Sequence, residues 1–342
     1  MKLGLMTGYW GAGPPAGVEE QIALAEKLGF DSMWTAEAYG SDALVPLAWW
    51  GSRTTRLQLG TAIMQMSART PAATAMAAMT LDHLTDGRFL LGLGVSGPQV
   101  VEGWYGVPYA KPLARTREYV EIVRRIIARE DRVSFEGEHY TLPYPGGTGL
   151  GKALKSTIHP RRTDVPIYLA AEGPKNVALA AEIADGWLPF WFSPESDDFY
   201  RAALAEGFAR EGARHDFSDF EVACPVPIVI NPDPEVAASV IRPLLALYVG
   251  GMGAKGANFH FDVLARMGWE AECERIQQLY LEGRKDEAIG SIPLAMVEDV
   301  ALVGSFDKVR SELPRWEETV ITTMLVQGPP ELLRAIAELV LG

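Results

Sequence analysis

Short apolar runs alternate with segments of helical periodicity along the whole chain. The runs that predict buried strands are Lys2–Met6, Asp31–Thr35, Leu57–Ile63, Arg88–Leu93, Pro166–Ala170, Gly186–Phe190, Phe220–Ile230 and Val320–Val326. Helical spacing between them predicts Val18–Leu28, Ala43–Trp50, Pro71–Leu84, Leu113–Arg129, Pro174–Ala184, Pro194–Glu211, Pro234–Leu247, Val297–Gly304, Phe306–Leu313 and Pro330–Leu341. Strands that alternate with helices favour a parallel sheet. Eight such units without an internal repeat favour an α/β fold, a TIM-like (β/α)8 barrel that forms a single domain over residues 1–342.

Two segments interrupt this alternation and are predicted to be insertions. The first, at approximately 130–165, is rich in Pro, Gly and basic residues. The second, at approximately 248–285, begins with the glycine-rich stretch GGMGAKGANFHF. Long excursions of this kind in compact enzymes commonly carry function.

Composition narrows the classes of partner. The 342 residues are 48% hydrophobic and carry a net charge of −13, which disfavours nucleic acid and anionic membrane surfaces. The five histidines and two cysteines show no metal-ligand spacing, so no metal site is expected. The sequence has no apolar run long enough for a membrane span and no signal-peptide pattern. We therefore expect a cytoplasmic protein that acts on small molecules.

Small residues gather at the ends of two consecutive predicted strands. Gly94-Val95-Ser96-Gly97 ends one of them and completes a GxGxxG pattern that begins at Gly92. A Rossmann site would need a helix to start at this strand end and an acidic residue to end a second strand about 20 residues further on. Here Pro98 follows the glycines, and the position about 20 residues further on lies in the middle of a predicted helix. The alternative is a strand end kept small so that a flat ring can lie against the backbone. Thr61-Ala62-Ile63 ends the preceding strand in the same way, although an ordinary buried strand would show the same pattern, and it leads into a polar corner that begins at Gln65.

A third strand end predicts an anion site. Ala170-Ala171-Glu172-Gly173-Pro174-Lys175-Asn176 joins a strand to a helix whose first residue is Pro174. The free amides and the positive end of the helix would face the barrel mouth, and Lys175 would add a charge. Plain helix capping with a solvated Lys175 is the alternative.

Further strand-end residues suggest chemistry. Glu37 follows the second strand and would orient a cofactor or exchange a proton, unless it is a hydrogen-bonded structural residue. Arg69 stands at a helix start, where a cation is unfavourable, so it either has a partner or is solvated. Trp10, Trp191 and Phe192 follow strands and are candidates for an apolar substrate wall.

These residues resemble the bacterial luciferase-like superfamily, in its coenzyme F420-dependent branch. The matching pieces cover most of the first 190 residues, and the specific parts are Arg69–Gly97 and the run AAEGPKN followed by ADGW. The resemblance implies a TIM-like barrel with a deazaflavin across its mouth. It further implies a bulge with a cis peptide at Ala62-Ile63, a phosphate cradle at Gly173-Pro174, and Glu37 beside the ring.

The predicted site has cofactor-binding, proton-donating and substrate-contacting residues. Cofactor-binding residues are Glu37, Thr61, Ala62, Ile63, Gln65, Gly94, Val95, Ser96, Gly97, Glu172, Gly173, Pro174, Lys175 and Asn176. Glu37 and Tyr39 are the candidate proton donors, with water as a third source, and Trp10, Trp191 and Phe192 are the candidate substrate wall.

The chain also departs from the family's sugar-phosphate and alcohol dehydrogenases. Ala38 stands where they carry a His, and Pro98 stands where they carry a Glu, so their acid/base pair is absent. The sequence therefore favours an F420-dependent oxidoreductase that moves hydride to or from an apolar organic substrate, because the cofactor itself carries the difficult chemistry. The alternatives are an FMN-dependent monooxygenase of the same superfamily and a flavin- or deazaflavin-binding protein without turnover.

Two further expectations follow from the resemblance. F420 carries an anionic tail that FMN lacks, and Lys152, Lys155, Arg161 and Arg162 are candidates for a basic groove that would hold it, although a solvated loop would look the same. Dimers are usual in the family, so the resemblance implies a homodimer, and the helices after the second and third strands are the candidate interface.

Overall fold

The eight predicted strands close into one parallel barrel in a computed structural model, which describes residues 1–253 and 256–342. The barrel strands are β1 (Lys2–Met6), β2 (Ser32–Thr35), β3 (Gln58–Thr61), β5 (Phe89–Gly94), β8 (Ile167–Ala170), β9 (Gly186–Leu188), β10 (Glu221–Pro225) and β13 (Thr323–Val326). They pair in that order, and β13 pairs with β1 to close the ring. The single-domain (β/α)8 prediction is confirmed.

The barrel interior is filled by large side chains set against glycines. Trp34 and Tyr168 meet edge to face with their ring centroids 5.4 Å apart. A Cβ atom at Gly60 would lie 2.2 Å from the Trp34 ring, and one at Gly186 would lie 2.4 Å from Tyr168. Both aromatic rings are therefore accommodated only because the neighbouring strands lack side chains there.

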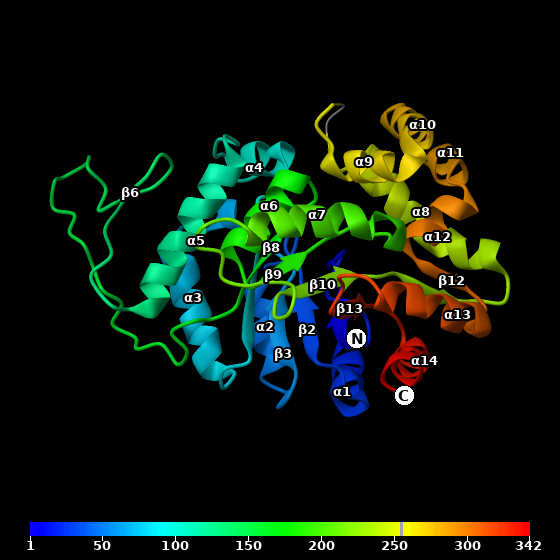
Figure 1. The fold of residues 1–342 in the computed structure, drawn as a ribbon, viewed down its shortest axis with the longest axis horizontal. Coiled ribbons are helices and arrows are strands. Elements are labelled where there is room, and N and C mark those ends of the chain that lie inside the picture. Colours follow the sequence, from blue (N-terminus) through cyan, green and yellow to red (C-terminus); the bar gives the residue numbers. More distant parts are fainter. Residues whose placement is uncertain (254–255) are drawn as a thin grey trace.

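Helices cover the outside of the barrel (Figure 1). They are α1 (Val18–Leu28), α2 (Leu44–Gly51), α3 (Pro71–Leu84), α5 (Pro112–Ala128), α6 (Pro174–Ile183), α7 (Asp197–Phe208), α8 (Pro234–Gly250), α13 (Phe306–Glu317) and α14 (Pro330–Leu341). Five of them start with Pro, whose missing N–H has no intrahelical partner at that position. Thr70 caps α3 by accepting from the Ala73 N–H at 3.2 Å.

Two predicted elements differ from the structure. Phe220–Ile230 is two strands rather than one, because the strand breaks at Val226-Pro227 and Pro227 has no N–H to donate. β10 stays in the barrel, while β11 (Ile228–Ile230) pairs outside it with β12 (Leu302–Gly304). The helix predicted at Val297–Gly304 is therefore also wrong. Its first half ends α12 (Leu294–Val300), and its second half is β12.

The two predicted insertions are built differently. Residues 130–165 form a long excursion whose regular structure is the hairpin of β6 (Phe135–Glu136) and β7 (Thr141–Leu142), and it extends away from the barrel at the left of Figure 1. Residues 248–285 begin at the end of α8, and residues 254–255 of this segment lie outside the described residues. The remainder forms α9 (Phe259–Leu264), the π-helical η3 (Ala265–Trp269) and α10 (Glu270–Leu281), followed by α11 (Lys285–Gly290).

These added helices have a hydrophobic cluster of their own. Leu245 and Val249 of α8, Cys273 and Ile276 of α10 and Val297 of α12 are all buried within it. The cluster lies beside the barrel core, and Trp191 from the loop after β9 belongs to it. The helices α9 to α12 are therefore held by burial of apolar surface rather than by the barrel strands.

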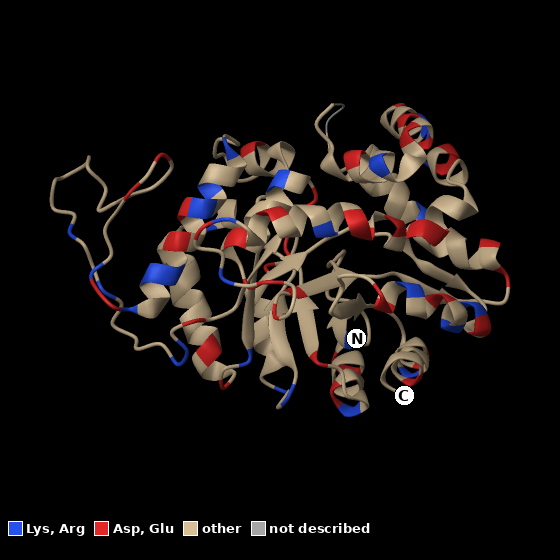
Figure 2. Cartoon of the chain, viewed as in Figure 1, with Lys and Arg blue, Asp and Glu red and all other residues tan. Residues whose placement is uncertain are grey.

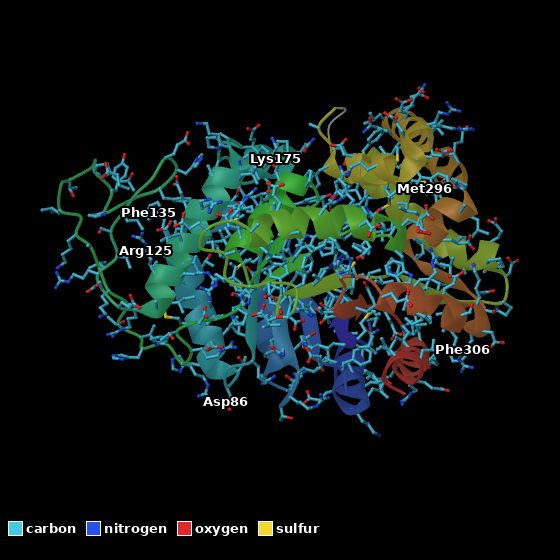
Figure 3. The ribbon with its side chains drawn as sticks, in the orientation of Figure 1. Asp86, Arg125, Phe135, Lys175, Met296 and Phe306 are labelled. Carbon is cyan, nitrogen blue, oxygen red and sulfur yellow. The ribbon has the colours of Figure 1, made fainter. Side chains whose placement is uncertain are left out.

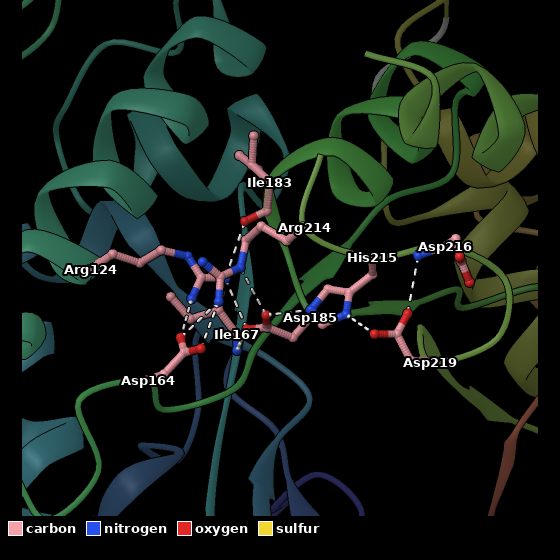
Figure 4. Close-up of polar contacts among 9 residues, drawn as sticks. All are labelled: Arg124, Asp164, Ile167, Ile183, Asp185, Arg214, His215, Asp216 and Asp219. Atoms are coloured by element: carbon pink, nitrogen blue, oxygen red, sulfur yellow. Dashed lines mark hydrogen bonds and ion pairs between the residues drawn. The ribbon is translucent and has the colours of Figure 1, made fainter. Parts of the chain in front are cut away.

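An ion network joins the segments that enter β8, β9 and β10 (Figure 4). Asp185 pairs with Arg124 at 2.8 Å and with His215 at 2.8 Å, and Asp219 accepts from the other His215 nitrogen at 2.8 Å. Burial opposes protonation of His215, but the hydrogen bonds and charges of Asp219 and Asp185 outweigh it and raise the pKa of His215 above its usual range. Arg214 and Asp164 complete the network.

Most charged side chains lie on the outer helices and loops (Figure 2), although a few, such as Glu37 and Asp82, are buried. Figure 2 shows Lys, Arg, Asp and Glu along the helices and loops, whereas the barrel strands at the centre carry few of them. No helix among the described residues has the length and apolarity needed to cross a membrane. The two ends of the chain meet where α1 packs against α14 (Figure 1).

Candidate active site

A cavity of about 740 Å³ lies at the carboxyl ends of the barrel strands. The loops after β1, β2, β3, β5, β8, β9 and β10 line it, together with α4 (Pro98–Gly103) and the region where α8 meets α9. Its volume falls in the range of small-molecule and cofactor sites. In a barrel of this kind the ligand site is expected at this end.

One wall of the cavity is a narrow surface of small residues. Ala62 and Ile63 come from the break between β3 and β4 (Met64–Gln65), and the peptide bond between them is cis, as the resemblance implies. Gly94 and Val95 lie beside them, and a Cβ atom at Gly94 would stand 2.8 Å from Cδ1 of Ile63. Ser96 and Gly97 continue this wall.

A buried hydrogen-bond pair holds the two strands of that wall together. The Thr61 hydroxyl donates to the Gly92 carbonyl at 2.8 Å and accepts from the Gly92 N–H at 2.9 Å. Thr61 is fully buried and does not line the cavity. It supports the wall instead of contacting a ligand.

An acidic cluster lies beside the small-residue wall. Glu37 is buried, and its two carboxylate oxygens accept from Nη1 of Arg69 at 2.8 and 3.0 Å and from the Ala43 N–H at 3.1 Å. Arg69 also pairs with Asp42. Burial opposes ionisation of Arg69, but the hydrogen bond that Arg69 donates to Glu37 and the charges of Glu37 and Asp42 outweigh it and hold the pKa of Arg69 above its ordinary value. Of the two predictions for Arg69, an ion-pair partner or solvation, the structure confirms the partner.

Gln65 connects this cluster to the cavity. Its Nε2 donates to the Ala38 carbonyl at 2.9 Å, which orients the amide. Its Oε1 is buried and has no hydrogen-bond partner among the described residues. The side chain lines the cavity, so an N–H group of a ligand would satisfy this oxygen.

The start of α6 forms another edge of the cavity. Gly173 and Asn176 line it, whereas Pro174 and Lys175 are exposed and face away from it. The N–H groups of Asn176 and Val177 both bond to the Gly173 carbonyl, which leaves the Gly173 and Lys175 N–H groups without a backbone acceptor in the described chain. Lys175, labelled in Figure 3, is the second residue of α6.

The remaining wall is aromatic. Phe190, from the loop after β9, stacks on Tyr248 of α8 with centroids 4.3 Å apart, and His260 of α9 lies edge-on to Tyr248 at 4.7 Å. Tyr248 donates to the Tyr9 hydroxyl at 3.5 Å. Burial raises the pKa of both tyrosines, so each hydroxyl stays protonated at neutral pH.

Comparison with known proteins identifies the family. The family model described as luciferase-like monooxygenase matches residues 3–323. The chain belongs to this luciferase-like family.

Several members of the luciferase-like family are similar over their whole length. A Mycobacterium tuberculosis protein named "Putative coenzyme F420-dependent oxidoreductase Rv3520c" is 56% identical over 343 residues, which cover 99% of each chain. The solved coenzyme F420-dependent tetrahydromethanopterin reductase of Methanopyrus kandleri superposes with a TM-score of 0.78 at 22% identity, covering 100% of this chain and 98% of that one. An F420-dependent secondary alcohol dehydrogenase gives 0.77 at 19% identity, covering 99% and 98%. These two structures support the fold.

The three aromatic residues predicted to form the substrate wall do not line the cavity. Trp191 is 2% exposed within the cluster of added helices, and Phe192 is 1% exposed in the barrel core. Trp10 packs on Trp50 with centroids 5.9 Å apart and does not line the cavity. Phe190, the residue before Trp191, is the aromatic side chain that this loop places in the cavity, because the chain turns away after it.

The predicted basic groove also lies elsewhere. Arg161 pairs with Asp86 at 2.5 Å, and Arg162 pairs with Asp82 and donates to the carbonyl of Phe89, the first residue of β5. These contacts are at the amino ends of the strands, opposite the cavity, as the positions of Asp86 and Lys175 in Figure 3 show. Lys155 donates to the Glu130 carbonyl, and Lys152 is exposed on the same excursion.

Sequence reasoning missed the part of the site that comes from helices. Gln99 reaches the cavity from α4, and Trp104 reaches it from the position that follows this helix. Because α4 begins at Pro98, the interpretation of Pro98 as evidence against a helix start after Gly97 is wrong. The Pro at N1 was the available signal. Tyr248 and His260 come from α8 and α9, and no strand-end rule points to them.

Proposed function

We propose that this protein is an F420-dependent oxidoreductase that transfers a hydride between the deazaflavin and an apolar organic substrate. One observation carries the proposal: the same cavity is lined by a narrow wall of small residues and by a helix start with free N–H groups. The wall suits a flat ring, and the helix start suits a phosphate. The similar protein from Mycobacterium tuberculosis, with F420 in its name, supports this cofactor.

The residues of the cavity fit this cofactor. Gln65 presents a buried oxygen without a partner toward the cavity, which the N–H edge of a deazaflavin would fill. Gly173 has no atom within 4 Å of a Cβ position, so the edge at α6 has room for a phosphate. When bound, the deazaflavin would supply the hydride chemistry, and the chain would supply position and a water-poor surrounding.

In this proposal Glu37 is a positioning residue. Both of its oxygens accept hydrogen bonds, from Arg69 and from the Ala43 N–H, and these contacts hold the carboxylate in place. It anchors Arg69 and the loop after β2 next to Gln65. Tyr39 lines the cavity with a largely exposed side chain, and it remains a proposed proton donor.

Binding of F420 to the start of α6 is tested by three substitutions of one glycine. Gly173→Asp should weaken F420 at least tenfold, because a carboxylate at the helix start repels the phosphate. Gly173→Asn, of equal size, should weaken it less, and Gly173→Ala should bind like the unmodified protein because the Cβ position is open. Affinity is measured by quenching of Trp fluorescence on titration with F420.

The same titration is run with FMN and with thermal unfolding as a fold control. Asp is a good N-cap residue, so Gly173→Asp should not lower the melting temperature. Tighter binding of FMN than of F420 would favour the monooxygenase alternative. Binding of neither cofactor would reject the proposal, and tight binding of F420 without hydride transfer to any substrate would favour the non-catalytic alternative.

We also propose a cytoplasmic homodimer. Val45 and Trp49 of α2 and Met76 and Leu84 of α3 are exposed apolar side chains on the two helices that follow β2 and β3. Exposed apolar side chains that gather on one face are characteristic of interaction sites, and we propose that these side chains do so. A second copy of the chain is the proposed partner.

A further inference from the structure

A second polar cluster lies in the aromatic wall of the cavity. Nδ1 of His260 is 2.8 Å from Oε1 of Glu172, a distance suited to an ion pair although the two groups are not aligned as a hydrogen bond. The side chains are 10% and 9% exposed. Oε2 of Glu172 is buried without a hydrogen-bond partner among the described residues. A buried carboxylate left half satisfied is costly, and such groups inside a cavity are functional-site candidates.

The neighbours of His260 hold its ring in place. The Phe190 ring centroid lies 5.4 Å from the imidazole centroid at an interplanar angle of 62°, and that of Tyr248 lies 4.7 Å away at 86°. Nδ1 lies 2.8 Å from Oε1 of Glu172, and Nε2 makes no hydrogen bond with any described residue. His260 lines the cavity, so Nε2 is the nitrogen available to a ligand.

The titratable and charged groups around His260 come from four elements. They are Glu172 in the loop after β8, Tyr248 on α8, Arg266 on η3 and Asp262 on α9 itself. Arg266 donates to the main-chain carbonyl of Glu172 at 3.0 Å and thereby ties η3 to the loop that carries the carboxylate. Glu172 is the one carboxylate in contact with the imidazole.

We propose that His260, held by Glu172, is the acid/base residue that exchanges a proton with the oxygen of a carbonyl substrate. The proposal rests on the proposed function. The loops after β2 and β5 offer Ala38 and Pro98 where the family's dehydrogenases carry their acid/base pair. Here a His and a Glu reach the same cavity from α9 and from the loop after β8.

The step balances as a carbonyl reduction. A hydride adds to the carbonyl carbon, the π electron pair of the C=O bond moves to oxygen, and the proton on Nε2 of His260 passes to that oxygen to give an alcohol. The hydride comes from the reduced cofactor, which is oxidised, and the imidazole regains its proton from water. Glu172 stabilises the imidazolium before the transfer. The reverse sequence oxidises the alcohol.

The first test needs no cofactor. Diethyl pyrocarbonate modifies neutral imidazole, and peptide mass spectrometry measures its rate at His260 at pH 6. We expect His260 to react, and Glu172→Gln to react at a several-fold different rate, because the carboxylate lies 2.8 Å from Nδ1 of the same ring. Asp262→Asn, which removes an exposed carboxylate on the same helix, should react like the unmodified protein. An unreactive His260, or equal rates in Glu172→Gln and the unmodified protein, would overturn the pair.

The second test uses reduced F420 with cyclohexanone and, in parallel, with the cyclic imine 1-pyrroline. His260→Gln should lower kcat for cyclohexanone about 10²-fold, the usual contribution of a general acid. Its Kd for F420, from Trp fluorescence, should stay within twofold, and Asp262→Asn should keep both values. The assignment is overturned if kcat is unchanged or if the affinity for F420 falls in parallel. It is also overturned if the unmodified protein, loaded with F420, does not reduce cyclohexanone, whether or not it reduces the imine.

The two tests separate this inference from the proposed function. If F420 does not bind the unmodified protein, the proposed function fails, while the labelling rates still decide whether His260 and Glu172 act as a pair. If F420 binds and His260→Gln reduces cyclohexanone at the original rate, the proposed function stands and this inference fails.

Discussion

At the residue scale, the Glu37–Arg69 contact shows how a strand-end carboxylate can serve position rather than proton transfer. Glu37 is buried, and its charge is balanced by a guanidinium that also reaches Asp42. The sequence identified both residues as unusual, Glu37 by its place after a strand and Arg69 by its place at a helix start. It did not indicate that each explains the other, because they are 32 positions apart and meet only through the fold.

Removal of Arg69 should be costly. Arg69→Ala leaves Glu37 buried without its main partner, and we expect a loss of about 2–3 kcal/mol in the free energy of unfolding. Urea denaturation measures this value. Arg315→Ala breaks an exposed pair with Glu195 and should change it little. Equal effects of the two substitutions would contradict the structural role given to Arg69.

At the scale of elements, helices that begin with a proline were easier to predict from the sequence than short apolar runs. Pro71, Pro174 and Pro330 each mark the first residue of a helix that the structure confirms. The run from Val297 to Gly304 was misassigned because a short apolar stretch has no clear period. It becomes a strand after Val300 because β11 offers it a pairing partner.

The ion network at the amino ends of β8 and β9 should make stability depend on pH. The pKa of His215 is raised in the folded protein, so its stabilising contribution is complete below its unfolded value of about 6.5 and is lost as the pH rises through the folded value. His215→Gln should therefore lower the free energy of unfolding more at pH 5.5 than at pH 8. Urea denaturation at the two pH values measures the difference.

Asp219 offers a matched check on this network. Asp219→Asn removes one of the two carboxylates that contact His215 and leaves Asp185 in place. The pH-dependent part of the stability should then shrink without disappearing. An identical effect of His215→Gln at both pH values would mean that His215 stabilises the protein through packing and not through its charge.

At the scale of the whole molecule, α2 and α3 carry exposed apolar side chains on the outside of the barrel. Trp49 is 61% exposed and Val45 is 69% exposed on this face. If a second copy covers them, Trp49→Glu should convert a dimer into a monomer, because the interface would bury an unpaired charge. Light scattering coupled to size-exclusion chromatography measures the mass.

A control substitution tests whether the face is specific. Val240→Glu places the same charge on an exposed position of α8 and should leave the dimer intact. A monomeric unmodified protein would contradict the proposed homodimer. A dimer that both substitutions leave unchanged would place the interface on another face.

The sequence by itself determined the barrel and one wall of its cavity. Alternating strands and helices specify the fold, and the residues after each strand reach one end because parallel strands all point the same way. Ala62, Ile63 and Gly94 were found by this rule. Only the tertiary structure placed His260 beside Glu172 and buried Trp191 in the hydrophobic cluster of the added helices. Those placements depend on how α8 and α9 pack beside the barrel, a long-range consequence of apolar burial that no local pattern encodes.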